Sequence, residues 1–158
     1  MIRQIRIVLV GVCAIAGAVV GPAVVAGAAR PAGRTSVAKI PVVLREFSVR
    51  PQRDFTSADS VTFVAKNAGT EVHELVLARL ADGRPLPVEA DGAADEAAIA
   101  ESDAEGEAED IPAGRSKRFT ASDLRPGAYE LFCNIVEQED GETVSHYAKG
   151  MHTVFVVQ

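Results

Sequence analysis

The chain has 158 residues, of which 47% are hydrophobic and 24% are charged, and its formal net charge at pH 7 is −6. This length gives room for one ordinary domain with a core of its own. The acidic balance argues against nucleic acid or an anionic membrane surface as a partner, and the chain has no tryptophan for stacking on bases.

Residues 1–29 have the pattern of a secretory signal peptide. Arg3 and Arg6 form a basic start, the stretch that follows carries no charge, and small residues close it with an A-x-A pattern. The same stretch could stay as a membrane anchor, since about 20 apolar residues span a bilayer. A lipid on Cys13 is a third alternative. In each case we expect the rest of the chain to be exported, to the periplasm, the cell envelope or the medium, with membrane contact only through a retained anchor.

Removal of this segment leaves about 129 residues, which we divide into a linker at 30–38 and a domain at 39–158. Loss of Arg3 and Arg6 leaves 14 Lys and Arg against 22 Asp and Glu, a net charge of −8. Only one cysteine remains, Cys133. Because a lone cysteine in an oxidising compartment cannot form an intrachain disulfide, it is a buried thiol, an intermolecular bridge or a ligand.

The domain consists of short β-branched and aromatic runs separated by Gly, Pro and Asn, which predict an all-β sandwich or barrel. No long segment has a sustained helical period. In the run 72–80 we expect His73, Leu75 and Leu77 on one face of a strand, with Val76 and Ala78 on the other. The expected strands lie at residues 40–47, 61–65, 72–80, 115–121, 129–133 and 151–157.

An acidic segment at residues 86–112 breaks this pattern. Ten acids and no Lys or Arg lie between residues 89 and 110. The Ala-rich part has helical propensity but no apolar stripe, since Ile99 is its only large hydrophobic residue. A block of like charge is typically solvated. We therefore expect a surface insertion between two strands, with a loose helix at most.

The residues that can ligate a metal are concentrated near the end of the chain. Beyond the first 29 residues there are three histidines, one cysteine and one methionine, and all but His73 lie within residues 133–152. Two imidazoles, a thiolate and a weak axial thioether suit an ion that cycles between Cu(I) and Cu(II). We predict one copper ion bound by four residues: His73, Cys133, His146 and Met151. If Met151 points to the metal, His152 points away from it, yet it remains an alternative to His146.

Three motifs carry a resemblance to a known family. They are Asn67-x-Gly69-x-x-x-His73-Glu74, then Pro126-Gly127-x-Tyr129-x-Leu131-x-Cys133-Asn134, and then His146-Tyr147-x-x-Gly150-Met151. Over residues 40–157 the chain resembles a bacterial cupredoxin of the plastocyanin/azurin-like type 1 blue copper superfamily. The resemblance implies a Greek-key β-sandwich with copper near one end. It also implies that His73, Cys133 and His146 are equatorial ligands, that Met151 is the axial ligand, and that Asn134 steadies the thiolate by hydrogen bonding.

The ligand loop departs from the family pattern. Twelve residues lie between Cys133 and His146, where small blue copper proteins have only a few. We expect residues 136–145 to form an inserted, acidic hairpin that leaves both ends of the loop intact. A flexible ligand loop would raise the reorganisation cost of electron transfer.

The leading functional hypothesis is a one-electron carrier of the cell envelope, monomeric, serving a redox partner protein whose surface could be basic. We expect no enzymatic activity, because multicopper oxidases and nitrite reductases need further histidines and only His152 is unassigned. Two alternatives stay open. One is a copper chaperone, buffer or sensor, which the long acidic loop would suit. The other is a cupredoxin-like interaction module that binds no metal.

Overall fold

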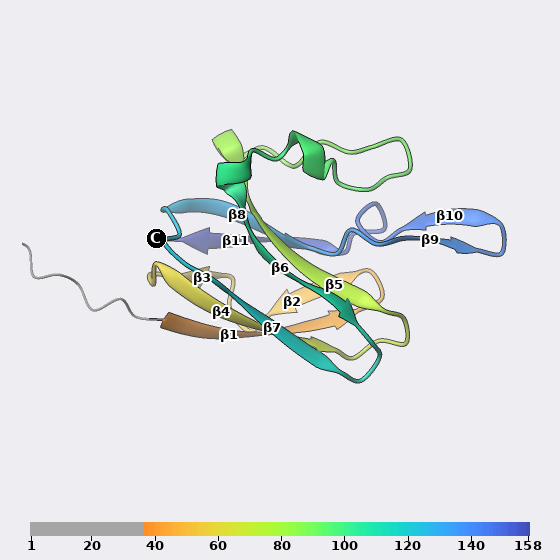
Figure 1. The fold of residues 1–158 in the computed structure, drawn as a ribbon, viewed down its shortest axis with the longest axis horizontal. Helices are drawn as coiled ribbons and strands as arrows, with labels where there is room; N and C mark the ends of the chain where they lie inside the picture. The colour runs from red at the N-terminus through yellow and green to blue at the C-terminus, as the bar shows by residue number, and fades with distance from the viewer. Residues whose placement is uncertain (1–36) are drawn as a thin grey trace, which may run out of the picture. The chain divides into compact units, whose positions relative to one another are not determined.

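The structure, a computed structural model, describes residues 37–158. The predicted signal peptide and most of the predicted linker lie outside these residues. No helix in the described part of the chain is long and apolar enough to cross a membrane. Figure 1 shows two facing sheets and a separate hairpin. The strands are β1 (Val37–Arg45), β2 (Ser48–Pro51), β3 (Phe55–Thr56), β4 (Ser60–Asn67), β5 (His73–Arg79), β6 (Ala104–Ile111), β7 (Ser116–Ala121), β8 (Gly127–Phe132), β9 (Val136–Glu139), β10 (Glu142–Ser145) and β11 (His152–Val157).

The first sheet has the order β2-β1-β4-β7. In β1 the side chains of Ile40, Val42 and Leu44 are buried, whereas Pro41 and Val43 between them are exposed. This alternation follows from the two-residue period of a strand, and it turns one apolar face of the sheet inward. Strand β1 pairs with β4 in parallel and with β2 in antiparallel orientation.

The second sheet has the order β3-β11-β8-β5-β6. Strand β5, which lies between β8 and the edge strand β6, is apolar on both faces, as the sequence predicts. Leu75 and Leu77 belong to the core between the two sheets, whereas Val76 and Ala78 belong to a second cluster on the outer face. That outer cluster also contains residues from β8, from the segment between β5 and β6, and from the turn between β10 and β11: Leu80, Leu86, Ala94, Phe132 and Tyr147. The predicted all-β sandwich is thus confirmed.

The acidic segment is only partly an insertion. Its last part forms strand β6, which pairs with β5 at the edge of the second sheet. Small and acidic residues alternate along β6, so that Ala108 packs inward while the acids beside it reach solvent. A charge run with period two therefore folds as an edge strand rather than as a solvated excursion. Ahead of β6, the chain between β5 and β6 runs over the outer face of the second sheet (Figure 1) and contains three short 3-10 turns, of which the last two lie in the acidic segment: η1 (Ala81–Gly83), η2 (Glu96–Ala98) and η3 (Glu101–Asp103).

Strands β9 and β10 pair as a hairpin at residues 136–145, and Figure 1 shows it projecting from one end of the sandwich. Asp140 and Gly141 form its turn with φ of 50° and 86°. Two consecutive positive φ values are those of a type I′ turn, which Asp-Gly sequences favour because glycine adopts them freely. The backbone amide of His146 donates to the carbonyl of Ile135 (2.9 Å), which closes the base of the hairpin. The insertion therefore leaves the two ends of the ligand loop side by side.

Candidate metal centre

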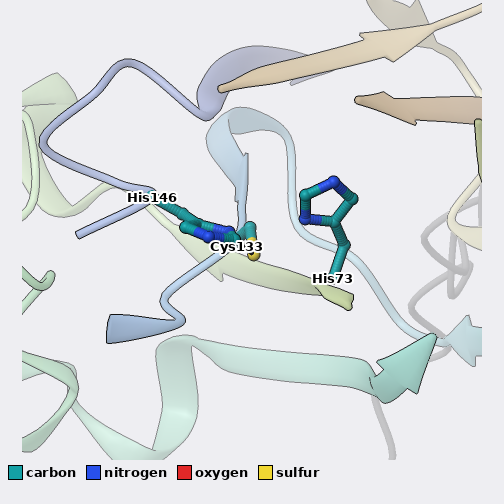
Figure 2. A group of neighbouring side chains, drawn as sticks. All are labelled: His73, Cys133 and His146. Carbon is teal, nitrogen blue, oxygen red and sulfur yellow. Dashed lines mark hydrogen bonds between the residues drawn. The ribbon is translucent and has the colours of Figure 1, made fainter. Parts of the chain in front are cut away.

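Three of the predicted ligands come together at the end of the sandwich from which the hairpin projects. His73 is the first residue of β5, Cys133 directly follows β8, and His146 directly follows β10. Each is fully buried, and one ligand atom from each lies within 4.8 Å of the other two. Figure 2 shows the Cys133 sulfur with the His146 ring close to it and the His73 ring on its other side. Residues far apart in the sequence thus converge on a single point.

The separations match donors that could share one ion. The Cys133 Sγ lies 3.4 Å from the Nδ1 of His146. The rings of His73 and His146 have centroids 5.2 Å apart and are inclined by 68°, so they meet edge to face rather than stacked. Two imidazoles and one thiolate are the trigonal donor set of type 1 copper centres.

His73 has the environment of a ligand rather than of a core histidine. Among the described residues, neither Nδ1 nor Nε2 of its buried ring has a hydrogen-bond partner. The nearest carboxylate is that of Glu46, whose Oε1 lies 3.7 Å from Nε2. An unpaired buried polar group costs free energy, so a ring of this kind is expected to have a binding partner such as a metal ion. Burial, followed by the neighbouring His146, lowers the pKa of His73, which keeps the ring neutral and able to bind a metal.

Cys133 needs a cation to become a thiolate. Burial raises the pKa of its thiol to about 12, against the effect of backbone hydrogen bonds from Glu74 and Ile135. Metal binding requires the deprotonated sulfur and releases its proton. The two backbone amides would then stabilise the sulfur anion, because a fixed N–H dipole favours the charged form. An ion with an affinity for sulfur fits this position.

Met151 lies fully buried in the same core cluster as Cys133. The backbone amide of Cys133 donates to the carbonyl of Met151 (3.0 Å), and the amide of Met151 donates to the carbonyl of His146 (3.0 Å). The chain therefore returns to the cysteine after the loop, as the predicted tight turn requires. Its role as the axial ligand remains a prediction.

The side chain of Asn134 makes different contacts from those that the resemblance implies. Its Oδ1 accepts from the amide of Ala94 (2.7 Å), and its Nδ2 donates to the carbonyl of Ala94 (2.9 Å) and to Glu96 (3.0 Å). None of the hydrogen bonds found within residues 37–158 joins it to the Cys133 sulfur. The side-chain amide of Asn134 therefore holds the segment before β6 next to the metal centre. The Cys133 sulfur has backbone hydrogen bonds from Glu74 and Ile135 instead.

His152 lies outside the three-residue group. Its Nδ1 is 2.8 Å from Glu130 Oε1, and its ring stacks on Tyr147 with centroids 4.6 Å apart. It is 40% exposed on the face of β11 opposite to the core. The expectation that His152 points away from the centre agrees with this position, and His146 is the histidine that joins the group.

Glu130 holds both ends of the turn that runs from His146 to Met151, a role that the sequence analysis missed. Its side chain, only 4% exposed, accepts from the hydroxyl of Tyr147 (3.1 Å) and pairs with His152. These two residues directly follow the predicted ligands His146 and Met151. A single carboxylate in the otherwise apolar run of β8 was the available signal, because buried carboxylates are nearly always paired.

We expect Glu130→Gln to loosen this loop. The amide keeps the shape of the carboxylate but has only one acceptor oxygen for two donors, so the free energy of unfolding should fall by about 1.5–3 kcal/mol. Hydrogen exchange should accelerate at the amides of Gly150 and Met151, which are bonded within the loop. Glu142→Gln on the exposed side of the hairpin is the matched control and should change stability by less than about 0.5 kcal/mol. Equal effects of the two variants would contradict the role of Glu130.

Carboxylates surround the two histidines on the side that faces away from the core. Glu137 Oε1 lies 2.9 Å from His146 Nε2, and Glu71 Oε2 lies 3.5 Å from it. Backbone hydrogen bonds, first that of Thr70, lower the pKa of Glu46 to about 2. Burial, and then the nearby charges of Glu137 and Glu139, raise the pKa of Glu71. The sequence predicted an acidic hairpin here but not its contact with a ligand.

A two-sheet sandwich with His, Cys and His converging at one end has the architecture of the cupredoxin class. No protein-family model matches the chain, and no curated protein does. Solved structures do. Auracyanin from Roseiflexus castenholzii matches with a TM-score of 0.52 and 17% identity, over 77% of this chain and 97% of its own.

Two further solved structures give the same result. Auracyanin A, a blue copper protein from Chloroflexus aurantiacus, matches with a TM-score of 0.51 and 17% identity over 78% of this chain and all of its own. Rusticyanin from Thiobacillus ferrooxidans matches with a TM-score of 0.52 and 16% identity over 77% of each chain. At this level of identity the likeness concerns the fold, and it confirms the predicted cupredoxin-like β-sandwich.

Proposed function

We propose that this protein binds one copper ion in a type 1 site and acts, after export, as a one-electron carrier of the cell envelope. The observation that carries the proposal is the buried group of His73, Cys133 and His146, whose ligand atoms lie within 4.8 Å of one another. When bound there, copper would supply a Cu(I)/Cu(II) couple. Met151, buried beside Cys133, is the candidate for the weak axial ligand.

The surroundings of the group favour electron transfer over metal exchange. Hydrogen bonds link His146 to Ile135, Met151 to His146 and Gly150 to Tyr147, while Ser145 Oγ donates to the carbonyl of Gly92 (2.8 Å). The loop is therefore held from several sides despite its inserted hairpin. Ligands that keep their positions in both oxidation states lower the reorganisation cost, and this argues against the alternative of a chaperone with a flexible loop.

The charge near the group suits a redox partner with a basic surface. Glu71, Glu137 and Glu139 lie close enough together that their charges affect one another. Complementary surface charge speeds encounter between proteins and matters less at high ionic strength. The proposal therefore includes recognition of a basic partner. It also includes a location in the cell envelope, which is inferred from the pattern of residues 1–29.

The decisive experiment is a copper titration of the form that begins near residue 30, followed by visible absorption and native mass spectrometry. We expect one copper per chain and an intense thiolate-to-copper charge-transfer band, because the sulfur of Cys133 adjoins both histidines. Rapid electron self-exchange, together with slow loss of Cu(I) to a chelator, should accompany it. Copper binding without this band would support copper handling instead. Rapid loss of Cu(I) to the chelator together with slow self-exchange would support the same alternative. A chain that binds no copper would support the metal-free module.

A further inference from the structure

We propose that Glu137, supplied by the inserted hairpin, is a positioning residue for the metal ligand His146, an inference that rests on the proposed copper site. The carboxylate accepts a hydrogen bond from Nε2–H of His146 and so fixes both the tautomer and the orientation of the ring. Nδ1 of His146 is thereby left with a free lone pair, with which it could bind the same copper ion as the Cys133 sulfur.

The geometry of His146 sets the direction of this bond. Its Nε2 lies 2.9 Å from Glu137 Oε1, and its Nδ1 lies 3.4 Å from the Cys133 sulfur. A carboxylate oxygen in contact with a ring nitrogen accepts the hydrogen bond, so this contact assigns the proton to Nε2 and leaves Nδ1 as the acceptor nitrogen next to the sulfur. A ring that is fully buried has no water to take over either role.

Other groups around the ring do not compete with Glu137. Glu71 Oε2 is 3.5 Å from the same nitrogen, too far for a good hydrogen bond, and it counts among the buried side-chain atoms without a hydrogen-bond partner in the described residues. Phe47 meets the ring edge to face, with centroids 5.7 Å apart, and offers no acceptor. One carboxylate therefore controls the proton on Nε2.

The hairpin is built so that Glu137 can return to the histidine. Val136 pairs with Ser145, and Glu137 pairs with Val144, which is buried. His146 is the residue directly after β10, so the base of β9 lies against it. The Glu137 side chain is partly buried, whereas Gln138 and Glu139, which lie closer to the turn of the hairpin, are exposed. The hairpin at residues 136–145 thus brings a carboxylate within hydrogen-bonding distance of a predicted ligand.

The two histidines differ in this respect. The closest carboxylate to Nε2 of His73 is 3.7 Å away and makes no hydrogen bond with it. Of these two predicted ligands, His146 is the one with a carboxylate of residues 37–158 at hydrogen-bonding distance, the arrangement in which an outer carboxylate raises the basicity of a metal-bound imidazole. Because the charge is negative, it should favour the more positive oxidation state of the bound ion. Glu137 should therefore strengthen Cu(II) binding more than Cu(I) binding.

The first experiment uses the copper-free protein and reads the histidine tautomers from ring ¹⁵N chemical shifts. In the wild type we expect His146 as the Nε2-protonated tautomer. Glu137→Ala should give a mixture of tautomers, whereas Glu137→Gln, which can still offer an acceptor oxygen, should keep more of the original one. Glu142→Ala removes the same charge from an exposed position of the hairpin and should leave the ring signals unchanged. An Nδ1-protonated His146 in the wild type would overturn the proposal.

The second experiment measures the affinities for Cu(II) and Cu(I) and the reduction potential. Loss of an outer-shell partner typically costs about 10–100-fold in metal affinity, and we expect a loss of that size for Cu(II) in Glu137→Ala. If Cu(I) affinity changes tenfold less than Cu(II) affinity, the potential rises by about 59 mV for a one-electron couple. Glu137→Gln should recover part of the lost affinity, and Glu142→Ala should match the wild type.

The two experiments separate the inference from the proposed function. A wild type that binds no copper, but whose His146 has the expected tautomer controlled by Glu137, would refute the copper function while the positioning contact stands. A copper-binding wild type in which Glu137→Ala and Glu142→Ala shift the potential equally would show that Glu137 acts only as one more surface charge. That result would overturn the positioning role.

Discussion

Cys133→Ser should abolish the thiolate-to-copper band and reduce copper affinity by more than the roughly 10–100-fold that loss of an outer-shell partner costs. The sulfur is the only soft donor at hydrogen-bonding distance from either histidine in the described residues. A serine hydroxyl has nearly the same shape, but it is a poor anion and a hard donor. The measurement is the visible spectrum and the copper stoichiometry of both proteins after the same titration.

The copper-free forms of the two proteins provide the control. Serine at this fully buried position loses little volume, so the variant should still fold, at a cost of about 1–3 kcal/mol for a buried hydroxyl. Far-ultraviolet circular dichroism should be the same for both. A folded Cys133→Ser protein that keeps one tightly bound copper with an unchanged band would contradict the proposed site.

Asn67→Ala should produce the largest loss of stability among polar substitutions away from the ligands, about 2–4 kcal/mol for three lost hydrogen bonds. The buried Asn67 amide donates to the carbonyls of Glu71 (2.6 Å) and Ile111 (2.7 Å). Its Oδ1 accepts from the amide of Gly69 (2.9 Å). It thereby joins the end of β4 to the end of β6 and shapes the turn that leads to His73. Urea denaturation of the copper-free protein measures the change.

Gln138→Ala is the matched control for this prediction. It also removes a side-chain amide, but one that lies exposed on β9 and bonds only to the Thr143 hydroxyl (2.9 Å). Substitutions of this kind usually change stability by less than about 0.5 kcal/mol. Similar denaturation midpoints for Asn67→Ala and the wild type would show that water replaces the three bonds of Asn67.

The sequence predicted those parts of the fold that depend on local pattern. A run of apolar residues with little polarity predicted β1, and the two faces of β5 followed from the two-residue period of a strand. The hairpin was predicted from the twelve residues between Cys133 and His146, and Asp140 and Gly141 suit its turn because few other residue pairs accept two positive φ values. The convergence of His73, Cys133 and His146 was predicted from ligand chemistry and from the resemblance of the surrounding motifs.

What the sequence did not reveal depends on partners that are distant in the chain. Strand β6 exists because β5 offers it an edge, and nothing in its acids and alanines indicates a strand by propensity. Strands β2 and β3 are four and two residues long, too short for a periodic signal. Glu130 and Glu137 acquire their roles only when Tyr147 and His146 are brought to them, so side-chain direction, rather than residue type, decides what they do.

The arrangement of the ligands along the chain has a consequence for the order of folding. Cys133, His146 and Met151 come from the last quarter of the chain, but His73 reaches them only when β5 pairs with β8. Long-range pairing of this kind is slow compared with closing a local hairpin. A refolding chain that meets metal early would therefore hold it with an incomplete donor set. The rate at which the final visible band appears would then measure how fast β5 pairs with β8. The bound ion would thus report when the second sheet is complete.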